Sequence, residues 1–97
     1  MILHTINAAP SSNALADCMA IAEPCDAVLL LGDGVYAALK DTVSCTQLQS
    51  SGAALYVLQA DAAAAGVLNL LADDIRLIDM DGFVELSETM PRQQAWY

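Results

Sequence analysis

The feature that most limits how this chain can fold is an uninterrupted apolar run, Ala27-Val28-Leu29-Leu30-Leu31, which Gly32-Asp33-Gly34 ends abruptly. A strand with one face in water alternates apolar and polar side chains. A strand of a parallel sheet covered by helices on both faces is apolar throughout. The run therefore predicts an internal strand of an α/β domain.

Further short apolar segments alternate with helix-like segments along the chain. We expect strands at residues 2–6, 27–31, 54–58 and 75–78, and helices at residues 14–22, 35–39, 62–65 and from Asp79 or Asp81 to about 88. The polar stretch 41–52 is expected to be loop with a weak helical turn, and the chain ends in a tail, Ala95-Trp96-Tyr97. Parallel strands joined through helices need right-handed crossovers. The prediction is one α/β domain spanning 1–97, a small three-layer αβα fold with a mainly parallel four-stranded sheet.

Composition points to protein partners. The 97 residues are 57% hydrophobic, and 3 basic against 12 acidic side chains give a net charge of −9. A chain of this size buries only about 60–65% of its unfolded surface, so the apolar excess predicts contacts with other subunits, although the 18 alanines offer a second explanation. Without a basic cluster, direct contact with nucleic acid or an anionic membrane is not expected.

Cellular location follows from the N-terminus and the cysteines. No basic segment followed by a long apolar stretch opens the chain, and no apolar run reaches the ~18–20 residues of a membrane span. Cys18, Cys25 and Cys45 form no Cys-x-x-Cys pair and cannot all pair with one another. We therefore expect free thiols in a reducing cytoplasm, with Cys25 packed beside a strand and Cys45 exposed in a loop.

Acidic and glycine residues follow the predicted strands, where open α/β sheets carry their functional groups. Gly32-Asp33-Gly34 lacks the Gly and Lys pattern of a phosphate loop and is interpreted as a turn in which Asp33 caps the next helix, with a partner or ligand contact as the alternative. Asp61 is expected to cap residues 62–65. The pairs Asp73-Asp74 and Asp79-x-Asp81 could bind a metal, but no histidine accompanies them and helix capping explains them better. No metal site or cofactor is predicted.

The only histidine, His4, alternates with Ile2 and Ile6 and so shares a strand face with apolar side chains. This favours a satisfied structural or interface histidine, while a dyad with a cysteine stays open because partners in space need not be neighbours in sequence. Trp96 and Tyr97 are either terminal packing or interface anchors.

Cys18 is the candidate for chemistry. It lies at the border of the apolar stripe of the first helix, about 60° from Leu15 at roughly 100° per residue, which predicts partial exposure. A free cysteine more often serves as a small apolar filler. Asp17 beside it would raise its pKa, and no base stands nearby in sequence.

The pieces of this chain, in their order and spacing, resemble the DsrH/TusB family. The resemblance covers essentially the whole sequence and rests on Leu3-His4-Thr5-Ile6-Asn7 with Pro10, on residues 27–39, on Leu55-Tyr56-Val57-Leu58, and on the ending from Asp74 through Phe83-Val84-Glu85-Leu86 to Gln94-Ala95-Trp96.

This resemblance implies a DsrEFH-like fold and a subunit of a TusBCD- or DsrEFH-type relay, a heterohexamer of three small homologous subunits that passes sulfur as a cysteine persulfide. The implied partners are TusC/DsrF-like and TusD/DsrE-like subunits and a downstream sulfur acceptor. The implied pathway is 2-thiolation of the tRNA wobble uridine, or alternatively dissimilatory sulfur oxidation.

The family's principal relay cysteine belongs to the TusD/DsrE-like subunit, while some DsrH/TusB members carry a cysteine where this chain has Cys18. Cys18 is therefore the one candidate catalytic residue, as an auxiliary sulfur carrier, and enzymatic activity of the chain alone is left open. An autonomous thiol acceptor working through Cys18, and a related domain with a different ligand, remain as alternatives. The sequence departs from the family at Ala65-Gly66, where many members have Arg-Gly.

Overall fold

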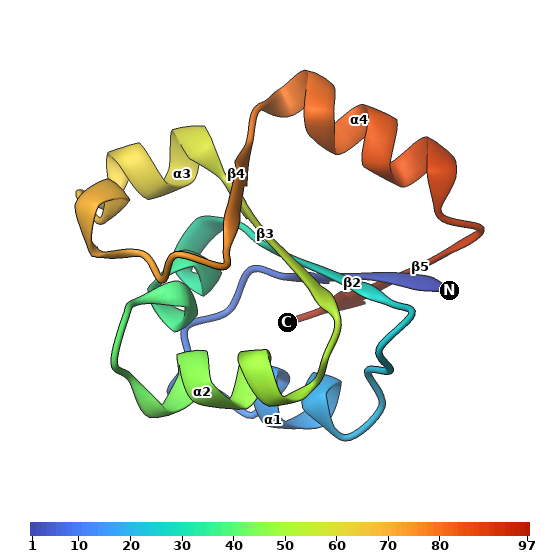
Figure 1. Ribbon diagram of the computed structural model, residues 1–97, viewed down its shortest axis with the longest axis horizontal. Helices are drawn as coiled ribbons and strands as arrows, with labels where there is room; N and C mark the ends of the chain where they lie inside the picture. Colours follow the sequence, from blue (N-terminus) through green and yellow to red (C-terminus); the bar gives the residue numbers. More distant parts are fainter.

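The computed structural model describes residues 1–97 and contains one five-stranded sheet with the order β4-β3-β2-β1-β5 (Figure 1). Every pair of neighbouring strands is parallel. The strands are β1 (Ile2–Ile6), β2 (Ala27–Leu30), β3 (Ala54–Leu58), β4 (Arg76–Ile78) and β5 (Arg92–Trp96). The helices are α1 (Ala14–Met19), η1 (Gly32–Ala38), α2 (Val43–Ser50), α3 (Gln59–Ala64), η2 (Leu68–Leu70) and α4 (Met80–Thr89), where η marks a 3-10 helix. The α/β class and the parallel sheet agree with the prediction.

The four-strand prediction was wrong, because the C-terminal tail forms a fifth strand. β5 pairs with β1 over its whole length, from Ile2 opposite Arg92 to Ile6 opposite Trp96. Its first four side chains are exposed, so the segment lacks the apolar pattern by which strands are recognised. An edge strand gains most of its order from the backbone ladder to its neighbour.

The polar stretch after η1 forms a regular helix where mainly loop was expected. The Thr42 side chain accepts a hydrogen bond from the Cys45 backbone N–H, the usual way to satisfy a free amide at a helix start. Cys45 and Leu48 turn inward at helical spacing, while the rest of α2 is mostly exposed. A helix with so narrow an apolar stripe carries little periodic signal.

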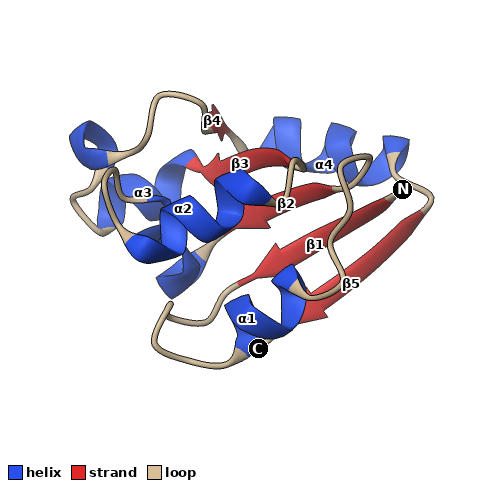
Figure 2. Ribbon diagram, turned by 60° about the horizontal axis from the view of Figure 1, so that its bottom comes forward, coloured by secondary structure: helices blue, strands red, loops and turns tan.

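The two faces of the sheet are covered unequally. α1, η1, α2 and α3 pack on one face over the larger apolar core, which includes Val28 and Leu30 of β2. α4 covers the other face through a smaller cluster that includes Leu29 of β2 (Figures 1 and 2). All four residues of β2 are buried, as the apolar run predicted. α4 itself contains no buried residue.

Candidate functional site

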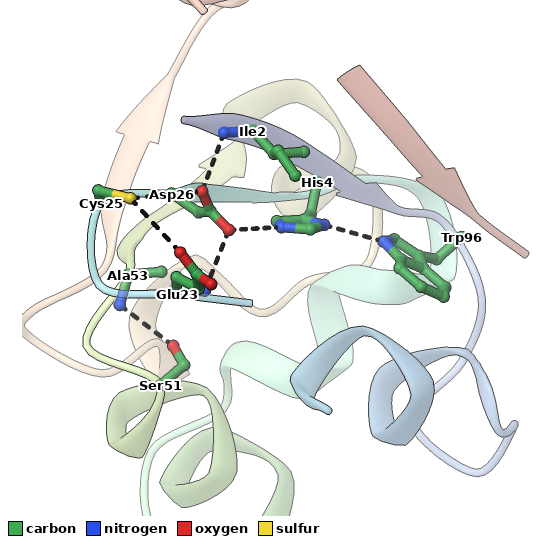
Figure 3. Close-up of polar contacts among 8 residues, drawn as sticks. All are labelled: Ile2, His4, Glu23, Cys25, Asp26, Ser51, Ala53 and Trp96. Atoms are coloured by element: carbon green, nitrogen blue, oxygen red, sulfur yellow. Dashed lines mark hydrogen bonds and ion pairs between the residues drawn. The ribbon is translucent and has the colours of Figure 1, made fainter. Parts of the chain in front are cut away.

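A chain of hydrogen-bonded side chains runs from the amino end of β2, across the middle of β1, to the last residue of β5. The His4 imidazole is fully buried; its Nε2 lies 3.0 Å from Oδ2 of Asp26, and the Trp96 indole Nε1–H donates to its Nδ1 at 3.1 Å (Figure 3). The three residues come from β1, from the loop before β2 and from β5. The expectation of a satisfied structural histidine is confirmed, and no cysteine contacts its ring nitrogens.

Asp26 is the centre of this arrangement, and it was not among the residues predicted from sequence. Its carboxylate accepts hydrogen bonds from the backbone N–H of Ile2 at 2.9 Å and of Glu23 at 3.0 Å, in addition to the bond with His4. Burial opposes the charged form, but the hydrogen bonds from His4, Glu23 and Ile2 outweigh it and hold the pKa of Asp26 at about 2. Asp26 is thus a buried carboxylate that joins the start of β1 to the loop before β2.

A weak signal for Asp26 was present in the sequence. In the parallel register Leu3 lies opposite Ala27 and His4 opposite Val28, so the residue before Ala27 lies on the same face as His4. An acid directly before a buried strand therefore needs partners on that face, because buried carboxylates are almost always hydrogen-bonded. Trp96 gave no comparable signal, since its place depends on the fifth strand.

The structure places Cys18 on the inner side of α1 with no exposed surface. Partial exposure was expected and is wrong. Burial, followed by the negative charge of Asp26, raises the pKa of the Cys18 thiol to about 12. A thiolate is the reactive form of cysteine, so Cys18 is held in its unreactive form in the folded chain.

The other two thiols lie opposite to expectation, although all three cysteines are free. Cys45 is buried because it lies on the inner side of α2, one turn before Leu48, and burial raises the pKa of its thiol. Cys25 is exposed, because the neighbouring Asp26 points inward; its sulfur lies 4.0 Å from Oε2 of Glu23 and 3.8 Å from Oδ1 of Asp26. Its nearest polar groups are therefore carboxylates and not a base.

Gly32-Asp33-Gly34 forms a turn, as predicted, closed by the hydrogen bond from the Gly34 N–H to the Leu31 carbonyl oxygen at 2.9 Å. Asp33 does not cap η1, whose start lacks any side-chain cap. Gly32 has φ of +53°, and its N–H donates to Oδ2 of Asp61 at 2.8 Å. Asp61 also does not cap a helix, because α3 begins before it at Gln59. These groups line a shallow hollow of about 240 Å³ at the carboxyl ends of β2 and β3, which Ala65 also borders.

In each of the two aspartate pairs, Asp73-Asp74 and Asp79-x-Asp81, one member has a structural role. Asp79 begins α4 as predicted and accepts from the Gly82 N–H at 2.8 Å. Asp74 accepts from the Gln49 side chain at 3.0 Å. No group of three or more histidine, cysteine, aspartate or glutamate side chains is arranged to hold a metal ion.

The fold and this site define a small parallel α/β domain. Hydrogen bonds among Asp26, His4 and Trp96 join β1 and β5 to the loop before β2, and the candidate thiol of Cys18 is buried. Comparison with known proteins gives the family. A family model described as "DsrH like protein" matches residues 8–93. The chain is 36% identical over 95 residues to proteins named TusB from Pectobacterium parmentieri and Sodalis glossinidius, and 35% identical to TusB from Yersinia pestis, in each case across 98% of this chain and all of the relative. The chain therefore belongs to the DsrH/TusB family.

A solved structure shows the same fold at much lower sequence identity. The crystal structure of the ychN protein from E. coli superposes with a TM-score of 0.74 at 15% identity, covering 97% of each chain. None of the helices in the present structure has the length and apolar character required to cross a bilayer.

Proposed function

We propose that this chain is a non-autonomous subunit of a cytoplasmic sulfur-relay complex that passes persulfide sulfur toward 2-thiolation of the tRNA wobble uridine. The observation that carries the proposal is the full-length similarity to proteins named TusB. The TusB name favours tRNA thiolation, while the DsrH family name leaves dissimilatory sulfur oxidation as the alternative pathway.

The state of the thiols favours a supporting role for this chain in the complex over direct transfer of sulfur. Persulfide transfer needs an accessible thiolate on the accepting protein. Cys18 is fully buried with a pKa raised to about 12, and Cys45 is buried as well. Cys25 is exposed, but the hydrogen-bond contacts of its sulfur are with the carboxylates of Glu23 and Asp26, which do not stabilise a thiolate. The accepting cysteine is therefore proposed to lie on a TusD/DsrE-like partner. An auxiliary role for Cys18 stays a prediction, and it requires binding of a partner to open the α1 side of the core.

The exposed apolar side chains support contact with homologous subunits. Beside seven exposed alanines, they include ten large residues: Met1, Ile21, Tyr36, Val43, Leu68, Leu70, Leu77, Met80, Val84 and Tyr97. Half of these large residues fall within residues 68–84, on η2, the edge strand β4 and the start of α4. We name Leu68, Leu70, Leu77, Met80 and Val84 the β4-edge surface. The buried centre of a contact between subunits is more apolar than the rest of a protein surface, so this surface is proposed to face a TusC/DsrF-like or TusD/DsrE-like partner.

Sulfur transfer is tested by incubating the chain, alone and with TusC- and TusD-like partners, with a persulfide donor and weighing each subunit by mass spectrometry. Sulfur on the partner only is the expected result. A persulfide on the isolated chain that disappears in Cys18→Ser but not in Cys25→Ser would replace the proposal with the autonomous alternative.

The proposed contact is tested by co-purification. Leu77→Asp combined with Val84→Asp should abolish retention of the partners. Ile21→Asp is the matched control, because Ile21 is 54% exposed but borders a hollow with Ile2 of β1 and Arg92 of β5, at the sheet edge opposite β4. Equal retention by both variants would refute the assigned surface.

A further inference from the structure

The C-terminal strand is anchored to the domain by a single side-chain hydrogen bond that enters the core. The side chains of Arg92 through Ala95 are exposed, and only that of Trp96 is partly buried. β5 lies at the edge of the sheet, so its outer backbone groups have no strand partner. Apart from its ladder to β1, β5 has two side-chain hydrogen bonds to the rest of the chain. One is exposed and runs from Gln93 Nε2 to the Ser87 carbonyl oxygen at 3.2 Å; the other joins the Trp96 indole, which packs against the larger core, to His4 (Figure 3).

The hydrogen bonds around His4 determine which of its nitrogens carries a proton. An indole N–H can only donate, so Nδ1 of His4, which it contacts at 3.1 Å, must be unprotonated. An ionised carboxylate can only accept, so Nε2, 3.0 Å from Asp26, carries the hydrogen. Asp26 remains ionised at all but strongly acidic pH because its pKa is held at about 2. The ring is therefore neutral, in its Nε2–H form, when Trp96 is docked.

We propose that protonation of His4 at Nδ1 releases the Trp96 indole and loosens β5, which makes the pair an acid-sensitive latch for the C-terminal strand. One proton from solvent takes the lone pair that accepts the indole N–H, so two donors then face each other. The Nε2–H bond to Asp26 survives and gains charge, because an imidazolium pairs with a carboxylate more strongly than an imidazole does. Protonation thus breaks the hydrogen bond of His4 with Trp96 and strengthens the one with Asp26.

The charged and titratable groups around the ring leave Asp26 as its only ionic partner. On this side of the sheet they come from the chain start, α1, the loop before β2 and β5: the Met1 amino group, Asp17, Cys18, Glu23, Cys25, Asp26 and Arg92. Asp17 is exposed on α1, and Glu23 and Arg92 border an open hollow with Met1 at the amino ends of β1 and β5. The His4 side chain donates one hydrogen bond, to Asp26, and accepts one, from Trp96; it has no others.

Two unique residues make the latch measurable in the intact chain, because the sequence contains one histidine and one tryptophan. The experiment is an NMR titration of the full-length protein from about pH 8 to about pH 5, the range in which imidazoles change charge. It follows the His4 ring nitrogens, the Trp96 indole N–H and the exchange of backbone amides corrected for its intrinsic pH dependence. At the upper pH the ring should show an unprotonated Nδ1.

As His4 takes up its proton, the indole N–H should shift in the same titration step, and exchange of the β5 amides should rise at least about tenfold while that of the β2 and β3 amides stays unchanged. Trp96→Phe keeps an aromatic ring but has no N–H to release. In that variant β5 should already exchange fast at the upper pH and respond little to acid.

Three results would overturn the latch. One is an indole N–H that keeps its shift while the ring titrates, and another is the same acid response of β5 in Trp96→Phe. The third is a ring that stays neutral until the whole domain unfolds. The titration of the unmodified chain decides the question even if the variant does not fold.

Discussion

Alkylation of the folded chain with iodoacetamide near neutral pH should modify Cys25 and leave Cys18 and Cys45 intact. Raising the pKa of the Cys18 thiol from 9.0 to about 12 lowers its thiolate fraction near pH 7 about 1,000-fold. The sulfur is also fully buried, so reaction must wait for the core to open. An opening that costs about 5 kcal/mol slows reaction roughly 10³ to 10⁴-fold relative to the unfolded chain.

The assay is intact-mass spectrometry over time, with and without denaturant. One equivalent of label on the folded protein, at Cys25, and three on the denatured protein are expected, because one cysteine is exposed and two are buried. Cys25→Ser should then take up no label when folded. If that variant is labelled at Cys18 within about tenfold of the denatured rate, the burial argument against an autonomous relay thiol fails.

Four further substitutions test the supports of the fold by urea unfolding. Asp26→Asn should lower the free energy of unfolding by about 2 kcal/mol at neutral pH, because the folded pKa of Asp26 is lowered from 3.8 to about 2. The contribution of Asp26 is complete above about pH 5 and disappears as the pH falls through 2, so the stability difference between variant and parent should close on acidification. A difference that does not change with pH would contradict this. Gly34→Ala should lower the free energy of unfolding by more than about 2 kcal/mol, because a Cβ there would collide with the Ile6 carbonyl oxygen. Gly66→Ala, at φ of +72° with no atom close to the added Cβ, should lower it by about 1 kcal/mol. Equal losses of stability in the two variants would refute the collision. Thr42→Ala should cost about 1 kcal/mol by removing the cap of α2, and an unchanged unfolding midpoint would show the cap to be dispensable.

Elements with a strong local pattern could be predicted from sequence. The apolar run at 27–31 predicted a strand covered on both faces, and β2 contributes Val28 and Leu30 to one core and Leu29 to the other. The segments without such a pattern were missed. α2 is polar apart from a narrow inner stripe, and β5 is an exposed edge strand held by its backbone.

Burial of single residues was the least predictable property of the candidate site. The expected positions of Cys25 and Cys45 were reversed, because the side of an element on which a residue lies depends on where that element begins and what it packs against. Cys45 is buried by a helix that was expected to be a loop, and Cys25 is exposed because its neighbour Asp26 turns toward His4.

By itself, the sequence determined the class of the fold, the family and a satisfied role for His4, since each depends on local periodicity or on residue order along the chain. Only the tertiary structure decided how His4 is satisfied and whether Cys18 is available. Asp26 and Trp96 lie 22 and 92 residues from His4 in the chain, and they meet it through the register of β1 with β2 and β5. Register and burial arise from contacts between distant segments, and those contacts set the ionisation of buried groups.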